Sequence, residues 1–220
     1  DSFRIEDVQT RHSKRANNKK RLKDAVKQFS IQQQALHASD RHAVLLVFQG
    51  MDAAGKDSTI SAVTRGVNPA GIQVFSFKKP SQKELDHDFL WRTNAAMPER
   101  GRIGIFNRSH YEEVLVVRVH PEILDYQQLP ESVERETIWE DRFESIRNQE
   151  QHLARNGTVI LKFWLNVSKE EQKKRFLARL DNASKHWKFN PGDIKERQCW
   201  DEYMEAYDSL LKQTSREWAP

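Results

Sequence analysis

The sequence contains only one cysteine, Cys199, among its 220 residues. A single thiol cannot form an internal disulfide, and it leaves no C-x-x-C pair for zinc or redox chemistry. The histidines are equally uninformative, because His87, His110 and His120 lack the spacing of a ligand set. These absences exclude a disulfide framework and favour a reducing compartment.

Long apolar runs are also missing. A membrane-spanning helix needs roughly 18 or more consecutive apolar residues, and no run in the chain approaches that length. The opening DSFRIEDVQT has neither the basic nor the apolar region of a signal peptide. We therefore expect a soluble, cytoplasmic protein with no membrane partner, and a fragment or processed form because the chain does not begin with methionine.

The charge balance is basic. The 36 Lys and Arg outnumber the 32 Asp and Glu, which gives a formal net charge of +4. Such a surface suits a polyanionic partner: nucleic acid, a nucleotide or a phosphate polymer. The chain is long enough for one well-buried domain.

Short apolar runs alternate with helical patterns along the chain. The run AVLLVFQ (43–49) is almost continuously apolar, which is typical of a strand buried on both faces of a parallel sheet. Residues 72–77, 102–107 and 158–167 are three further predicted strands. This alternation indicates βαβ units, and therefore an α/β fold with a parallel sheet.

Three intervening segments have helical spacing. Residues 82–97 are predicted to form one amphipathic helix, with Leu85, Phe89 and Arg92 on one side. A second predicted helix carries an apolar stripe, ends at Gly157 and includes Ile138, Phe143 and Ile146. A third begins at Ser168, a predicted N-cap that is followed by two glutamates in the first turn.

The segment FQGMDAAGKDSTI (48–60) follows the first predicted strand. Gly50, Gly55 and Lys56 match the phosphate-loop pattern G-x-x-x-x-G-K-[ST], but Asp57 occupies the Ser/Thr position. A strand, a glycine-bounded turn and a helix start would direct backbone N–H groups and a positive helix end at an anion. This context favours phosphate binding over a purely structural glycine turn.

Two aspartates distinguish this loop from an ordinary one. The hydroxyl that normally reaches Mg²⁺ is replaced by Asp57, and Ser58 and Thr59 come one and two places late. Asp52 would be repelled by phosphate unless a divalent cation lay between them or unless it oriented an attacking oxygen. The alternative is an aspartate that caps the following turn.

The segment FNRSHYEEVLVVRVHPE (106–122) follows the third predicted strand. Arg108 comes just past the end of that strand, and in a parallel sheet this end faces the ligand crevice. Arg108 is therefore a predicted clamp for a transferring phosphoryl group. The alternative is a surface ion pair with Glu112, four residues further on.

Four segments together resemble polyphosphate kinase family 2: GMDAAGKDSTI, VNPAGIQVFSFKKPS, LDHDFLWR and FNRSHYEEVLVVRVHPE. The segment FNRSHYE is similar to the corresponding segment of the class that phosphorylates AMP as well as ADP. The resemblance runs from about Phe48 to the C-terminus.

The resemblance implies a three-layer P-loop kinase fold with a helical lid. The implied reaction transfers the terminal phosphoryl group of inorganic polyphosphate to AMP or ADP, with Mg²⁺ or Mn²⁺, in a homodimer or homotetramer. Asp52, Lys56 and Arg108 are the implied catalytic residues. The implied phosphate-binding residues are Gly50, Met51, Ala53, Ala54, Gly55, Lys56, Asp57 and Ser58.

The resemblance also implies a metal site and an acceptor site, and at the metal site this sequence departs from most of the wider family. Asn107 stands where most of the wider family has a metal-binding aspartate, although the AMP-active class also carries asparagine. An amide is a weaker magnesium ligand, so the metal is expected on Asp52, with Glu112 or Glu113 as alternatives. Glu112 is the expected marker of AMP use. The predicted acceptor residues are Lys78, Glu112, Glu113 and Arg118, with a solvent-facing role as the alternative for Arg118.

The predicted lid covers residues 175–193. It carries a basic series suited to a polyphosphate chain: Arg175, Arg179, Lys185 and Lys188. The interleaved Trp187 and Phe189 would also fit single-stranded nucleic acid. The phosphate loop upstream argues against that reading, so no nucleic-acid partner is expected.

Residues 1–42 are predicted to form a basic helical extension, and residues 43–220 the kinase core with its lid. Eight Lys and Arg lie between Arg11 and Lys27 against one acid, Asp24. The extension is expected to be a solvated helix docked on the core or a source of attraction for an anionic substrate. Two other functions stay open: an ATP-dependent nucleotide or small-molecule kinase, and a noncatalytic polyanion-binding module.

Overall fold

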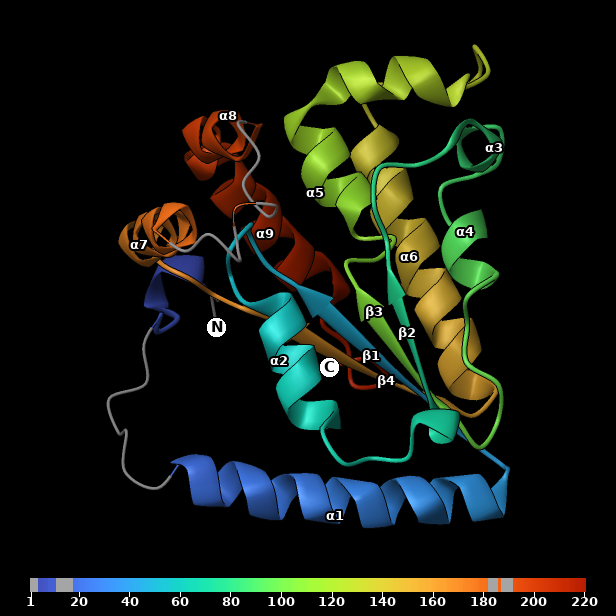
Figure 1. Cartoon of the computed structure of the whole chain (residues 1–220). Coiled ribbons are helices and arrows are strands. Elements are labelled where there is room, and N and C mark those ends of the chain that lie inside the picture. The colour runs from blue at the N-terminus through green and yellow to red at the C-terminus, as the bar shows by residue number, and fades with distance from the viewer. Residues whose placement is uncertain (1–3, 11–17, 182–185, 187–191) are drawn as a thin grey trace.

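The computed structural model describes residues 4–10, 18–181, 186 and 192–220 (Figure 1). Within these residues, the strands are β1 (Ala43–Gln49), β2 (Ile72–Ser76), β3 (Ile103–Asn107) and β4 (Thr158–Trp164). The helices of the first half are α1 (Asn18–Ser39), α2 (Lys56–Thr64), α3 (Gln82–Leu85), α4 (Trp91–Asn94) and α5 (Glu112–Val119). Those of the second half are α6 (Ile138–Arg155), α7 (Lys169–Leu180), α8 (Gly192–Gln198) and α9 (Trp200–Thr214).

The strands form one parallel sheet in the order β2-β3-β1-β4. β1 is paired on both sides, with Val44 opposite Ile103 of β3 and Val159 of β4. All residues of β1 except Val44 are buried, as its continuous apolar run predicts. The expected parallel α/β fold is confirmed.

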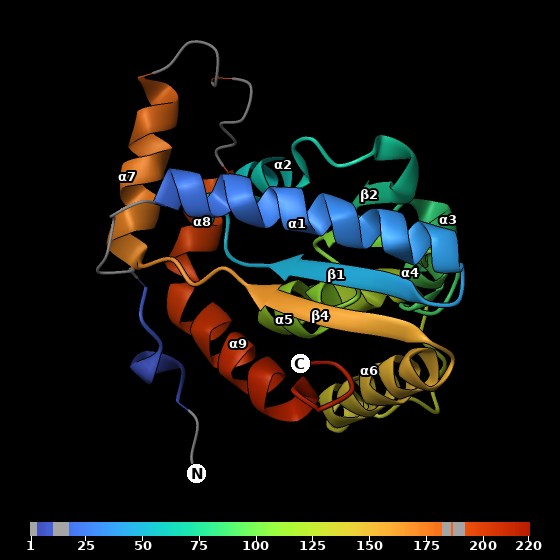
Figure 2. The ribbon, with the colours of Figure 1, turned by 90° about the horizontal axis from the view of Figure 1, so that it is seen from below.

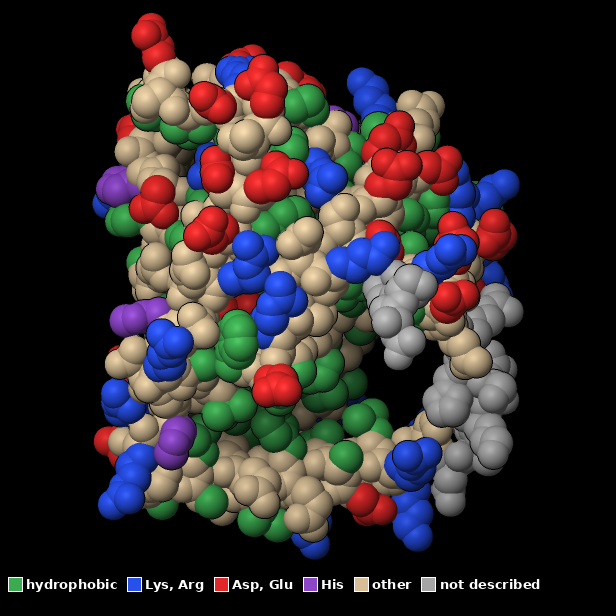
Figure 3. All heavy atoms as spheres, turned by 180° about the vertical axis from the view of Figure 1, so that it is seen from behind, with side chains coloured by type: hydrophobic (Ala, Val, Ile, Leu, Met, Phe, Trp, Pro, Cys, Tyr) green, Lys and Arg blue, Asp and Glu red, His purple; other side chains and the backbone are tan. Residues whose placement is uncertain are grey.

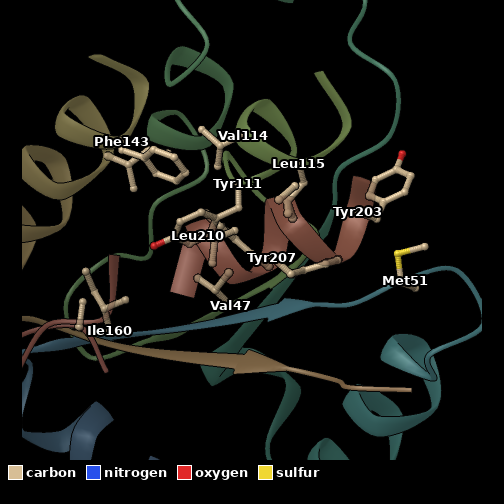
Figure 4. Packing of buried hydrophobic residues seen from close by; sticks show 14 of the residues in the cluster. Val47, Met51, Tyr111, Val114, Leu115, Phe143, Ile160, Tyr203, Tyr207 and Leu210 are labelled. Atoms are coloured by element: carbon tan, nitrogen blue, oxygen red, sulfur yellow. The ribbon is translucent and has the colours of Figure 1, made fainter. Parts of the chain in front are cut away.

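Helices cover both faces of the sheet, which makes three layers (Figures 1 and 2). α5, α6 and α9 lie on one face, and α1 and α2 lie on the other. Figure 4 shows Tyr111 and Leu115 of the α5 region and Tyr207 and Leu210 of α9 packed over Val47 of β1. Each Val or Leu side chain among them contributes about 1.5–3 kcal/mol when fully buried. This packing holds α5 and α9 against the sheet.

The opposite face is less completely covered. Phe29 and Leu36 of α1 pack beside Val44 and Ile72, but α1 runs alongside β1 and leaves β4 uncovered (Figure 2). Three apolar side chains of β4 are therefore exposed: Val159 (47%), Leu161 (36%) and Phe163 (41%). Figure 3 shows hydrophobic side chains gathered on this side, between α1 and the rest of the molecule.

The single helix predicted for residues 82–97 is wrong. The chain forms two short helices, α3 and α4, with a turn between them. Ser81 and Glu84 close a capping box at the start of α3, and the carboxylate of Asp88 accepts a hydrogen bond from the Leu90 backbone N–H at 2.9 Å. Local side-chain hydrogen bonds of this kind compete with helix continuation.

The two other helix predictions are confirmed. Ser168 caps α7 by accepting from the Glu171 N–H, and Ile138, Phe143 and Ile146 are buried on α6. Within the described part of the chain, no helix is both long and apolar enough to cross a membrane.

Candidate active site

The phosphate loop joins the buried end of β1 to α2. A Cβ at Gly50 would lie 3.0 Å from the Leu165 carbonyl oxygen, so the chain after β4 approaches too closely for a side chain there. Gly55 caps α2 with a left-handed backbone, φ +104°, which glycine adopts without the strain that other residues incur. Both glycines of the motif are thus required by the backbone path.

Lys56 is buried beneath this loop. Its ammonium group donates to the carbonyl oxygens of Gly50 at 2.6 Å and Met51 at 3.2 Å. Burial lowers the pKa of Lys56 to about 8, and the positive charge of Arg108 acts in the same direction. The direct partners of this lysine are uncharged carbonyl groups. A bound phosphate would supply a negatively charged partner.

Arg108 connects the loop to α5. It follows β3 with a left-handed backbone, φ 65°, and its guanidinium group donates to Asp52 at 2.5 Å and to Glu112 at 2.8 Å. The charge of Glu112, followed by that of Asp52, raises the pKa of Arg108 against the opposing effect of burial. The Glu112 ion pair weighed as an alternative is present, but so is a link to the phosphate loop.

Asp57 and Asn107 also meet at this edge of the sheet. The Asn107 side-chain amide donates to the Asp57 carboxylate at 2.7 Å. Ser58 does not substitute for the missing hydroxyl in the loop, since its hydroxyl donates back to the Gly55 carbonyl at 2.9 Å. The carboxylate and its uncharged partner therefore occupy exchanged positions relative to an ordinary P-loop.

Among the described residues, the other predicted acceptor residues do not join the contacts of Arg108 with Asp52 and Glu112. Glu113 lies on a different face of α5 from Glu112 and is buried against Arg142, at 3.3 Å, and Gln127. Burial raises the pKa of Glu113. Lys78 is exposed beyond β2, and Arg118 lies in the last turn of α5, about 9 Å along the helix from Glu112.

Two of the four predicted lid cations, Arg175 and Arg179, belong to the described residues. Arg175 of α7 donates to the carbonyl oxygens of Ala53 and Ala54 in the loop, at 3.0 and 2.8 Å. Arg179 forms an ion pair with Asp193 of α8 at 3.4 Å. Lys185 and Lys188 lie outside the described residues.

Several residues near the loop carry no motif in the sequence. Tyr203 and Tyr207 of α9 and Glu196 of α8 line a small pocket beside Asp52 and Arg108. The Tyr203 hydroxyl donates to Glu196 at 2.6 Å. Tyr203 and Tyr207 stand four residues apart on an amphipathic helix, and that pattern alone indicates only a core face.

The site suits a hard divalent cation that substrate phosphates help to bind. Among the described residues, no group of three or more His, Cys, Asp or Glu could hold a metal by itself. Mg²⁺ is usually held by one or two carboxylates together with substrate phosphates and water. Asp52 and Asp57 are the carboxylates of the phosphate loop, four residues before and one residue after Lys56 in the sequence.

A parallel sheet with a phosphate loop after its central strand, and an arginine beyond the neighbouring strand, defines a P-loop phosphotransferase. A family model described as Polyphosphate kinase 2 (PPK2) matches residues 11–220. The chain therefore belongs to the polyphosphate kinase 2 family, as the four sequence segments predict.

Individual relatives agree with this assignment. The chain is 58% identical over 200 residues to an ADP-polyphosphate phosphotransferase of Rhodopseudomonas palustris, covering 90% of this chain and 69% of the relative. It is 47% identical over 188 residues to an AMP/ADP-polyphosphate phosphotransferase of Meiothermus ruber, covering 86% and 66%. The chain thus spans about two thirds of the length of these curated relatives.

The fold also matches a solved structure. The crystal structure of polyphosphate kinase 2 from Arthrobacter aurescens superposes with a TM-score of 0.90 at 38% sequence identity. The match covers 99% of this chain and 76% of that one. At this level of identity, the likeness extends beyond the fold to the family.

Proposed function

We propose that this protein transfers the terminal phosphoryl group of inorganic polyphosphate to AMP or ADP, forming ADP or ATP. Family membership supports the reaction class, and the names of the two curated relatives support these substrates. The observation that carries the proposal is the chain of contacts from Asp52 through Arg108 to Glu112, beside the phosphate loop.

In the proposed reaction, a terminal phosphate oxygen of the nucleotide attacks the last phosphorus of the chain. The bond between that phosphorus and its bridging oxygen breaks, and polyphosphate leaves one unit shorter. Lys56 and Arg108 neutralise the charge spread over the transferring group, which is the main demand of a loose transition state. Asp52 orients the attacking oxygen, so no covalent enzyme intermediate is required.

Asp52 is the proposed ligand for Mg²⁺ or Mn²⁺, and we propose Asp57, the residue after the loop lysine, as a second carboxylate that contributes. When bound, the cation would withdraw charge from donor and acceptor oxygens. Asp52 is already aligned by the guanidinium group of Arg108 at 2.5 Å. The protein therefore holds this carboxylate in place before substrate arrives.

We assign the polyphosphate chain to the basic residues of α7 and the segment after it: Arg175, Arg179, Lys185 and Lys188. A polymer with about one charge per phosphate binds to a series of cations of this kind. On the acceptor side we propose Lys78, Glu112, Glu113 and Arg118. The position of Glu112, within 2.8 Å of Arg108, gives it the strongest support in that group.

The test is an assay without ATP. Purified protein is mixed with ADP, Mg²⁺ and polyphosphate, and ATP is measured by luminescence. Steady ATP formation supports the proposal. If no ATP forms from polyphosphate and ADP, but a separate reaction with ATP and AMP yields ADP, the protein is an ATP-dependent kinase. If neither donor is used, it is a polyanion-binding module.

Three broader features belong to the same proposal. We place the protein in the cytoplasm, which the single cysteine favours. We propose a homodimer or homotetramer without a nucleic-acid or membrane partner. We also propose residues 1–42 as a basic extension and residues 43–220 as the kinase core, because α1 contacts the sheet mainly through Phe29 and Leu36.

A further inference from the structure

Three successive carbonyl groups of the phosphate loop accept hydrogen bonds from α7. The side-chain amide of Gln172 donates to the Asp52 carbonyl oxygen at 2.9 Å. Arg175 donates to the next two, Ala53 at 3.0 Å and Ala54 at 2.8 Å. One face of the loop backbone is therefore bound to a helix more than a hundred residues away in the sequence.

These contacts fix the direction of the loop peptides. A trans peptide is planar, so the C=O of one residue and the N–H of the next point in opposite directions. The N–H groups of Ala53, Ala54 and Gly55 consequently face away from α7. Ala54 uses its N–H to close a turn on the Met51 carbonyl at 3.0 Å. In a phosphate loop, N–H groups turned to this side bind the anion, which assigns that role to the N–H groups of Ala53 and Gly55.

The loop also needs support at Ala53. Its backbone is left-handed, φ 59°, which is unusual for a residue with a Cβ. Such a conformation persists only where surrounding contacts hold it. The two α7 side chains supply contacts on either side of this residue.

Gln172 is itself held in one orientation. It is only 1% exposed, and its side-chain oxygen accepts from Arg197 of α8 at 2.9 Å. The same guanidinium nitrogen donates to the Lys169 carbonyl oxygen at 2.6 Å. With its oxygen bound to Arg197, the amide must direct its nitrogen at Asp52.

We infer that Gln172 is a positioning residue: the relay from Arg197 through Gln172 to the Asp52 carbonyl holds the phosphate loop in its anion-binding conformation. Gln172 acts through the backbone and need not touch substrate. It also joins α7 and α8, the helices before and after residues 181–191, to the residue that carries the proposed orienting carboxylate. The kinetic consequence rests on the proposed function, whereas the effect on the loop does not.

The first test measures the loop without turnover. Gln172→Met keeps the side-chain length but removes both hydrogen bonds and adds no charge. Gln198→Met, at an exposed position on α8, is the matched control. We expect Gln172→Met to weaken tripolyphosphate binding in calorimetry about tenfold, the equivalent of one lost hydrogen bond, and Gln198→Met to leave it unchanged.

Hydrogen exchange separates positioning from general destabilisation. In Gln172→Met, amides of residues 53–59 should exchange faster while those of β1 and β3 keep their protection. Unchanged tripolyphosphate affinity together with unchanged loop exchange would overturn the inference. If Gln172→Met does not fold, Arg197→Lys decides the matter, because it keeps the charge but loses the planar fork. Faster loop exchange in that variant supports the relay, and unchanged exchange overturns it.

A kinetic experiment uses polyphosphate as the donor and ADP as the acceptor. A misplaced loop should lower kcat about 10- to 100-fold and change the KM for ADP less than about threefold. An unchanged kcat in Gln172→Met would contradict the inference. A wild-type protein with no activity would contradict the proposed function alone, since the binding and exchange results would still stand.

Discussion

Asn107, the last residue of β3, donates its side-chain amide to the carboxylate of Asp57, the second residue of α2, at 2.7 Å. An ordinary P-loop has a hydroxyl after the lysine and a carboxylate at the end of the neighbouring strand, and both serve Mg²⁺. Here the carboxylate lies in the loop and the uncharged partner on the strand. We therefore predict that the two departures from the motif compensate each other.

This exchange predicts a specific pattern in a double-mutant cycle. Asp57→Ser removes the carboxylate, and Asn107→Asp places a second one within hydrogen-bond distance of the first. We expect each single variant to lower kcat about 10- to 100-fold and to raise the Mg²⁺ requirement. The double variant should recover most of the loss, as measured by rates over a Mg²⁺ titration. Losses that simply add would contradict the compensation.

Arg108 is predicted to raise kcat by stabilising the transition state. Arg108→Lys keeps a charge, but an ammonium group cannot reproduce the two-sided contact with Asp52 and Glu112. We expect kcat to fall about 10²- to 10³-fold, with a melting temperature within a few degrees of wild type because the guanidinium group is one-third exposed. A variant that changes only KM would show that Arg108 binds substrate without stabilising the transition state.

Glu112 is predicted to influence the choice of acceptor. ADP carries more negative charge than AMP, so a carboxylate beside the site opposes ADP more strongly. Glu112→Asn should therefore lower the ratio of kcat/KM for AMP to that for ADP, measured with polyphosphate as donor. Glu144→Asn, at an exposed position on α6, controls for the loss of a surface charge. An unchanged ratio in Glu112→Asn would remove Glu112 as a determinant.

The titration of Lys56 is predicted to set the pH dependence of kcat/KM for polyphosphate. Because burial lowers its pKa to about 8, the free enzyme loses this positive charge as the pH rises through that value. We expect kcat/KM for polyphosphate, which reports on the free enzyme, to fall on the alkaline side of about pH 8. The kcat at saturation should persist to higher pH, since bound phosphate favours the charged lysine. A flat kcat/KM from about pH 7 to about pH 10 would contradict this prediction.

The sequence was sufficient wherever one local pattern determined the structure. The apolar run of β1 and the Gly50, Gly55 and Lys56 spacing predicted a buried strand followed by a phosphate loop, and the structure contains both. The helical spacing of Leu85, Phe89 and Arg92 was misleading, because turn hydrogen bonds at Asp88 outweigh a weak helical pattern.

The sequence could not indicate contacts between distant segments. Gln172 and Asp52 are 120 residues apart, and nothing around Gln172 distinguishes it from any other polar residue of an amphipathic helix. Glu112 and Glu113 are adjacent in the sequence, yet only Glu112 reaches Arg108. The helix rotation that separates them depends on how α5 packs against α6 and α9.

The most direct measurement is ³¹P NMR of wild-type protein and Asp52→Asn, each with polyphosphate and Mg²⁺, with AMP and ADP as separate acceptors, and with no ATP added. The account predicts that the wild type produces the resonances of ADP and ATP while the polyphosphate chain shortens, and that Asp52→Asn produces them at least about a hundredfold more slowly. If the wild type makes neither nucleotide, or if Asp52→Asn makes them at the wild-type rate, the central claim is contradicted.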